Sequence, residues 1–159
     1  MPDPRWLTDD EQDAWRQLAG VMTRLPAVLD AQLQRDAGLT HFGYWVLAML
    51  SEAPGRALRM SELAARSNSS LSRLSHGVTR LVAQGWVRRE RAPDDGRGAV
   101  AVLTDAGWDK LVAAAPSHVE SVRRLVFDAL DADQVAVLGQ LGRLLLAKVD
   151  EATSPPKGA

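Results

Sequence analysis

Apolar residues recur every three or four positions through most of the chain, and this period predicts amphipathic helices. The first helix is predicted to follow the capping box Thr8–Glu11 and to end at Gly38. Pro26 lies inside it and is expected to kink or interrupt it. A second helix is predicted to begin after Thr40 and to close before Pro54, which starts a turn.

The middle of the chain predicts two short helices. An extended piece at 57–60 precedes a helix capped by Ser61, and either Ser69 or Ser70 caps the next one. That helix is predicted to end at Gly85, because glycine suits the left-handed residue that follows a helix C-terminus. Its apolar residues, all expected to point inward, are Leu71, Leu74, Val78 and Leu81.

Two strands are then predicted at 86–91 and 99–103, on either side of a segment rich in turn-forming residues. Thr104 and Asp131 cap two further helices, and Pro116 is expected to bend the first of them. Two short helices followed by a hairpin predict a winged helix-turn-helix. The fold class is therefore mainly α with a small β wing, and helices flank this lobe on both sides.

The helix that begins near Ser70 is the best candidate for a chemical role. Serines are poor residues inside helices because their hydroxyl groups compete for the backbone, so their clustering here favours a function over an ordinary solvated face. Small hydroxyl groups let a helix approach base edges, and arginine pairs with guanine or phosphate. The candidate DNA-contacting residues on it are Ser69, Ser70, Ser72, Arg73, Ser75, His76 and Arg80.

The hairpin supplies the other candidate contacts. Arg97 near its tip is expected to enter a minor groove, where the negative potential is strongest. Asp95 is positioned to orient that guanidinium group, or simply to form a turn. Arg88 and Arg89 point to opposite faces of the strand, so only one of them can face DNA. We include Arg88 in the candidate set.

Composition limits the alternatives. The 159 residues are 46% hydrophobic and 25% charged, which is typical of a globular protein. No apolar run is long enough to span a membrane, and the acidic N-terminus does not resemble a signal peptide, so we expect a cytoplasmic protein without a membrane partner. The net charge of −1 conceals nine arginines against four acidic residues between Arg56 and Arg97. This local excess suits a polyanion, although a solvated surface has the same composition.

Four short motifs, in this order, resemble the MarR family of multiple-antibiotic-resistance-type regulators. They are Ser61-Glu62-Leu63-Ala64, the run from Arg80 to Val87, Asp95-Gly96-Arg97 and the run from Val102 to Gly107. The resemblance covers roughly residues 39–111. It implies a homodimer with interlocking first, fifth and sixth helices, a recognition helix in the major groove, Arg97 in the minor groove, and a small aromatic or anionic ligand that loosens DNA binding. His76 and Gly77 depart from the common pattern, so base preference is not carried over.

The flanking helices predict self-association. The last helix is apolar around more than one side, and burial against a second copy is the simplest way to cover it. We therefore expect a dimerisation helix at 1–38, a DNA-binding lobe at 39–104, dimerisation helices at 105–153 and a flexible tail at 154–159.

A pocket for a small effector is a further expectation. Its candidate walls are the side chains of Trp15, His41, Tyr44 and Trp45. The same four residues also suit a structural role in the core or the dimer interface, which is the simpler interpretation.

An enzyme is not expected. His41, His76 and His118 are far apart in the sequence, and no phosphate-binding loop or nucleophile motif occurs. With no cysteine, thiolate metal sites and disulfides are excluded. We expect no catalytic residue, metal or cofactor. The remaining alternative is a winged-helix module that binds a protein instead of double-stranded DNA.

Overall fold

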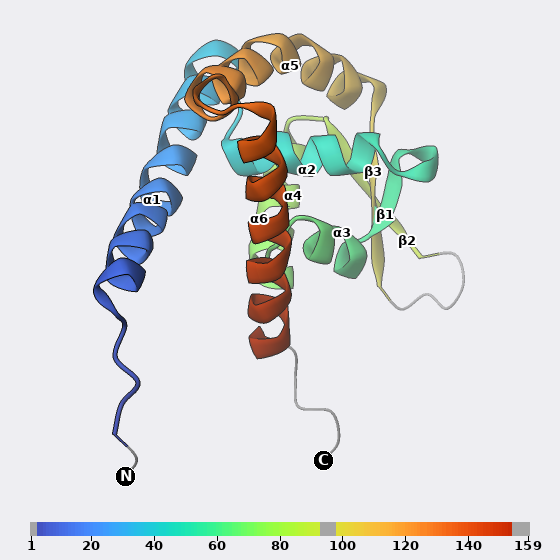
Figure 1. Ribbon diagram of the computed structural model, residues 1–159. Coiled ribbons are helices and arrows are strands. Elements are labelled where there is room, and N and C mark those ends of the chain that lie inside the picture. Colours follow the sequence, from blue (N-terminus) through green and yellow to red (C-terminus); the bar gives the residue numbers. More distant parts are fainter. Residues whose placement is uncertain (1–2, 93–97, 154–159) are drawn as a thin grey trace, which may run out of the picture. The chain divides into compact units, whose positions relative to one another are not determined.

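The computed structural model describes residues 3–92 and 98–153, which form helices and one small antiparallel sheet (Figure 1). The elements in chain order are α1 (Asp9–Ala37), α2 (His41–Ser51), the 3-10 helix η1 (Pro54–Arg56), β1 (Ala57–Arg59), α3 (Met60–Arg66), α4 (Leu71–Ala83), β2 (Val87–Arg91), β3 (Ala99–Leu103), α5 (Asp105–Leu125), the 3-10 helix η2 (Phe127–Ala129) and α6 (Ala132–Thr153). This is the order of a winged helix-turn-helix with flanking helices, so the predicted fold class is confirmed. Among the described helices, none is both long enough and apolar enough to cross a membrane.

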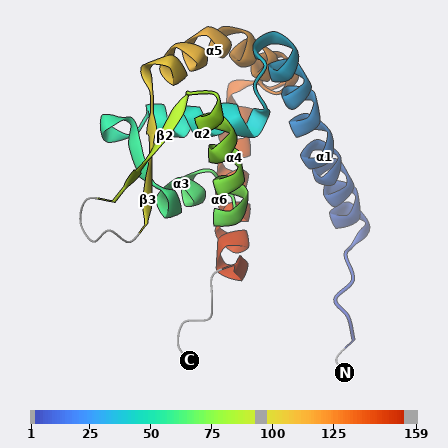
Figure 2. The same ribbon diagram turned by 180° about the vertical axis from the view of Figure 1, so that it is seen from behind.

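The chain divides into two compact units, Met1–Val119 and Glu120–Ala159, with α5 running from the first into the second. In the first unit the strands lie in the order β1-β3-β2, and both pairs are antiparallel. Figure 2 shows α4 beside β2. The core beneath α2, α3, α4 and the sheet contains fully buried side chains, among them Leu47, Leu50, Leu63, Leu74 and Val78.

Most predicted helix caps are confirmed by hydrogen bonds. Thr8 and Glu11 form the expected capping box, and the Thr40 hydroxyl oxygen accepts a bond from the Gly43 amide. Asp131 forms a second capping box, in which its carboxylate accepts from the Gln134 amide. These side chains satisfy amides that the helices leave without an internal partner, which fixes where each helix begins.

Two local expectations were wrong, those for Ser61 and Leu71. Ser61 does not cap α3, which begins one residue earlier, at Met60. Both α1 and α5 continue through the prolines they contain, Pro26 and Pro116. The buried residues that follow Pro26, such as Leu33, dock α1 against the core and offset the cost of the proline. Leu71, which was expected to point inward, is 54% exposed.

Candidate nucleic-acid interface

Both ends of α4 are closed by local hydrogen bonds. At the start, the Ser70 hydroxyl oxygen accepts from the Arg73 amide at 3.2 Å. At the end, Gly85 adopts a φ of 75°, and the Gly85 and Trp86 amides donate to the Val82 and Leu81 carbonyl oxygens. This pair of bonds is the Schellman motif that Gly85 predicted. The capped helix holds its outer side chains at defined positions.

The two sides of α4 differ in chemistry. Leu74, Gly77, Val78 and Leu81 are buried. At 100° per residue, the direction opposite this buried face is occupied by Ser72, His76 and Thr79, which are all exposed. The sequence analysis had named Ser72 and His76 but not Thr79, whose place follows from its spacing of three after His76. The outermost surface of α4 is therefore polar and carries no acidic residue, lysine or arginine.

Arg73 and Arg80 flank this polar strip on one side. The Arg73 guanidinium carbon lies 4.8 Å from the centroid of the Phe42 ring, in a cation–π arrangement. Phe42 also explains Gly77, because a Cβ atom at residue 77 would lie 2.7 Å from the Phe42 Cε1 atom. The glycine lets α2 approach α4, and the ring that fills the space supports Arg73.

Ser69, Ser70 and Ser75 lie around the first two turns of α4. Ser70 is exposed, whereas Ser69 and Ser75 are partly covered. Both of these partly covered serines are hydrogen-bonded: Ser69 Oγ donates to the Ser70 carbonyl oxygen, and the Ser75 hydroxyl oxygen accepts from Arg89. The serine cluster thus includes the helix cap and a contact to the wing.

The wing strand β2 contacts α4 through Arg89, which the sequence analysis did not select. Its Nη2 donates to the Ser75 carbonyl oxygen at 2.7 Å and to the Ser75 hydroxyl oxygen at 3.2 Å. Arg88, on the opposite face of the strand, forms an ion pair with Glu90. The alternation of side chains along a strand predicted that these two arginines point to opposite faces. Only the fold shows that Arg89 is the one that faces α4. The predicted contacts Asp95 and Arg97 lie outside the described residues.

A cavity of about 780 Å³ lies between α1, α2 and the turn before α4. Two of the four predicted pocket residues, His41 and Trp45, line it, together with Phe42, Ser67 and Arg73. The Ser67 hydroxyl group is buried and has no hydrogen-bond partner among the described residues. A buried hydroxyl group of this kind needs a partner such as water or a ligand. The cavity therefore combines aromatic walls, the cation of Arg73, the carboxylate of Asp30 and an unsatisfied polar group.

The other two predicted pocket residues lie elsewhere. Trp15 is 55% exposed on α1. Tyr44 is buried, with its ring 4.3 Å from that of His118, and burial raises its pKa. Neither is among the described residues that line the cavity.

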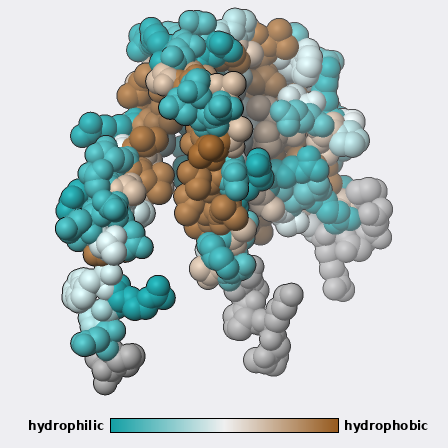
Figure 3. All heavy atoms as spheres, in the orientation of Figure 1, coloured by the Kyte–Doolittle hydropathy of each residue, from teal (hydrophilic) through white to brown (hydrophobic). Residues whose placement is uncertain are grey.

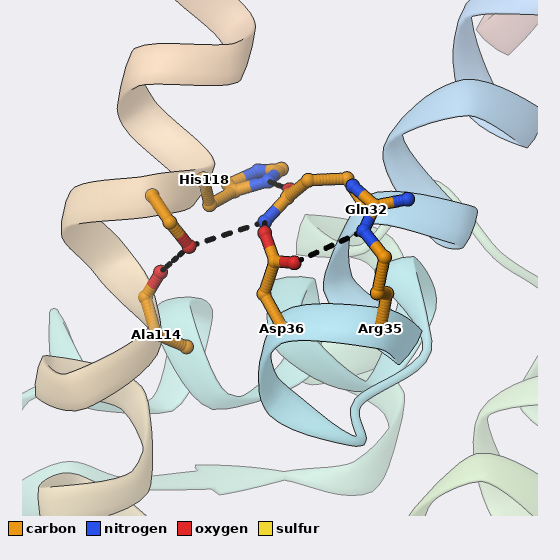
Figure 4. Close-up of polar contacts among 6 residues, drawn as sticks. Gln32, Arg35, Asp36, Ala114 and His118 are labelled. Carbon is orange, nitrogen blue, oxygen red and sulfur yellow. Dashed lines mark hydrogen bonds and ion pairs between the residues drawn. The ribbon is translucent and has the colours of Figure 1, made fainter.

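A polar network centred on the buried side chains of Gln32 and His118 joins α1 to α5 (Figure 4). His118 Nδ1 lies 3.1 Å from Gln32 Oε1, and Gln32 Nε2 donates to Asp36 at 2.9 Å and to Ser117 at 3.2 Å. The Gln32 oxygen can only accept, so the neutral His118 ring donates from Nδ1. His118 is only 6% exposed.

The pKa values of the two histidines at this junction, His41 and His118, are both lowered. Burial lowers the pKa of His118, and a positive charge on His41 lowers it further, since the two rings are 5.7 Å apart. Burial also lowers the pKa of His41, although the Asp30 carboxylate partly offsets that effect. Both shifts favour uncharged rings between α1, α2 and α5.

This chain is similar to a known protein family and to solved structures. The profile of the MarR family matches residues 38–98. None of the curated protein sequences compared with the chain matches it.

Solved structures resemble almost the whole chain. The chain is 47% identical to Sco3205, a MarR family transcriptional regulator from Streptomyces coelicolor solved in complex with DNA, with a TM-score of 0.89 over 98% of this chain and 96% of that one. It is 40% identical to AbsC, a MarR family transcriptional regulator from the same organism, with a TM-score of 0.87 over 93% and 99%. A mutant MarR from E. coli complexed with operator DNA is 26% identical, with a TM-score of 0.72 over 82% and 91%.

Proposed function

Since this chain belongs to the MarR family of transcriptional regulators, we propose that it binds double-stranded DNA as a homodimer and represses transcription by occupying a promoter. The observation that carries the proposal is the exposed polar strip of Ser72, His76 and Thr79 on α4, with Arg73 and Arg80 beside it. Such a strip fits a major groove, where short side chains approach base edges and arginines bind guanine or phosphate. The DNA complexes of Sco3205 and of E. coli MarR support the same partner.

The proposed contacts divide into three groups. Ser72, His76 and Arg73 read base edges, whereas Arg80 and Arg88 hold the phosphate backbone. Arg97, which follows Asp95 by two residues, enters the minor groove. Replacing Arg73 with alanine is then expected to cost about 1–3 kcal/mol and to relax preference at one base pair.

The homodimer proposal rests on apolar residues that the described chain leaves uncovered. Every described residue of α6 is at least partly exposed, including Leu138, Leu141, Leu145 and Val149, which recur every three or four positions. Figure 3 shows hydrophobic side chains gathered along this helix. An apolar stripe of this extent is characteristic of an interface, and a second copy supplies the matching stripe. A two-fold dimer predicts a pseudo-palindromic operator with half-sites about 10 base pairs apart.

Selection of bound fragments from random duplex DNA tests this function. We expect enrichment of a palindromic sequence, and an affinity that falls steeply as salt rises because bound phosphates release counterions. Failure to enrich any sequence, together with binding that does not change with salt, would contradict DNA recognition. That result would favour the alternative, a winged helix that contacts another protein.

We also propose that the cavity beside Phe42 binds a small aromatic acid that relieves repression. The ring would lie against Trp45 and Phe42, and the carboxylate would accept from Ser67 or pair with Arg73. Arg73 also belongs to the proposed DNA surface. A ligand carboxylate bound in the cavity would therefore compete with DNA for the Arg73 guanidinium group. Benzoate is a suitable probe: it should raise the melting temperature of the wild type but raise it less in Ser67→Ala. An equal shift in both proteins would remove Ser67 from the site.

A further inference from the structure

Leu71 is an exposed leucine on the first turn of the proposed recognition helix. Its side chain is 54% exposed, although the apolar residues that follow it on α4, such as Leu74 and Val78, are fully buried. It lies directly after the N-cap residue Ser70 and directly before the exposed Ser72. An apolar side chain thus stands among hydroxyl groups, on the surface proposed to face DNA.

The fold explains why Leu71 is uncovered. The helical period places it on the flank of α4 that faces the wing, on the same side as Ser75. There it borders a shallow hollow of about 320 Å³ with Met60, Ala99 and Arg89. The first turn of α4 contains no acidic residue, so nothing on it repels a phosphate backbone that approaches Leu71.

A leucine cannot donate or accept a hydrogen bond, so it cannot bind a phosphate or a polar base edge. The one apolar group that a base presents in the major groove is the C5 methyl group of thymine. We propose that Leu71 contacts this methyl group once in each half-site, and that it thereby selects a thymine at one position. This proposal rests on the DNA-binding function proposed above and names a specificity-determining residue for it.

The contact should discriminate in a defined way. Cytosine in the same place presents no methyl group, and deoxyuridine lacks the methyl group but keeps every hydrogen-bonding atom of thymine. Replacing one thymine by deoxyuridine therefore removes only the proposed apolar contact. Burial of one methyl-sized group corresponds to about a fourfold change in affinity.

The test uses the full-length protein and the operator obtained by selection from random DNA. Each thymine of a half-site, with its symmetry mate, is replaced in turn by deoxyuridine, and the affinity of the wild type and of Leu71→Ala is measured. We expect one position at which the wild type loses about fourfold per half-site. Leu71→Ala should bind the unmodified operator more weakly and show no further loss at that position.

Two variants serve as controls. Val82→Ala shortens another exposed apolar side chain on α4, three turns away, and should retain the full deoxyuridine effect. Leu71→Met keeps an apolar side chain of similar length and should retain most of it. A wild type that is indifferent to every replacement, or a Leu71→Ala protein that is as sensitive as the wild type, would overturn the proposal while leaving DNA binding intact. If selection yields no operator at all, the proposed function fails together with it.

Discussion

At the scale of single residues, two helical glycines lie in opposite surroundings. A Cβ atom at Gly107 would lie 2.1 Å from the carbonyl oxygen of Trp86, which is backbone and is held by the start of β2 and the end of α4. A Cβ atom at Gly20 would meet nothing within 4 Å. Gly107 is therefore required by close packing, whereas Gly20 is not.

This contrast predicts opposite effects of the same substitution. Gly107→Ala should lower the free energy of unfolding by about 1–3 kcal/mol, because the clash forces α5 away from β2. Gly20→Ala should raise it by about 0.5–1 kcal/mol, because alanine loses less conformational freedom in a helix. Urea unfolding of both variants measures the difference, and changes of the same sign in both would contradict the packing argument.

Arg89 allows a prediction about how the wing acts on α4. Its guanidinium group is engaged by two acceptors on Ser75, so we assign it a positioning role rather than a phosphate contact. Arg89→Ala should weaken DNA binding without changing the slope of log affinity against log salt. Arg80→Ala should lower the magnitude of that slope by about 0.9, as expected for one lost phosphate contact. If Arg89→Ala lowers the slope as much as Arg80→Ala does, Arg89 binds phosphate.

The sequence predicted the outer residues of α4 better than those near its ends. Ser72, Arg73 and His76 follow directly from the helical period. Leu71 was wrongly expected to be buried because it fits the helical period of the apolar residues on α4. The period does not show whether another element lies over that residue. Arg89 was missed because its partner, Ser75, lies on another element fourteen residues away.

At the scale of elements, the junction of α1, α2 and α5 should make stability depend on pH. The pKa values of His118 and His41 are both lowered in the folded protein from an ordinary value of 6.5. Well above pH 6.5 both rings are neutral in the folded and the unfolded chain, so the stabilising contacts are complete. As pH falls below 6.5, the unfolded chain takes up protons that the folded chain resists, and the free energy of unfolding decreases.

The decrease should be at most about 1.4 kcal/mol per pH unit for each histidine. Urea unfolding at pH 7.5, 6.5 and 5.5 measures it. His118→Asn keeps an N–H donor for Gln32 but cannot titrate, so its stability should depend less steeply on pH below 6.5. Equal dependence in the wild type and this variant would show that His118 does not control the junction.

Element order could be derived from the chain because most of the α-helices begin at a residue whose side chain caps them. Thr8, Thr40, Ser70 and Asp131 each accept a hydrogen bond from the amide three residues ahead, and no distant contact is needed. The polar network of Gln32 and His118 could not be derived, because its members are 86 residues apart and meet only when α1 and α5 pack. The cavity beside Phe42 also forms only when separate elements pack, in this case α1, α2 and the turn before α4.

At the scale of the whole molecule, the apolar surface of α6 leads to a prediction about assembly. Leu141 and Leu145 lie one turn apart on the exposed stripe, 51% exposed each. Carboxylates at both positions would place charges inside the proposed interface, where they lose hydration without gaining partners. The double variant Leu141→Glu and Leu145→Glu should therefore shift the protein from dimer to monomer in sedimentation velocity.

The same variant should separate assembly from DNA chemistry, because it leaves α4 unchanged. A monomer engages only one half-site, so its affinity for a full palindromic operator should fall towards its affinity for an isolated half-site, which should itself remain unchanged. Gln140→Glu adds a carboxylate to the same helix outside the apolar stripe. It should change neither the oligomeric state in sedimentation velocity nor the affinity for the full operator. A double variant that stays dimeric and keeps full operator affinity would show that α6 is not the surface through which two copies of this chain join.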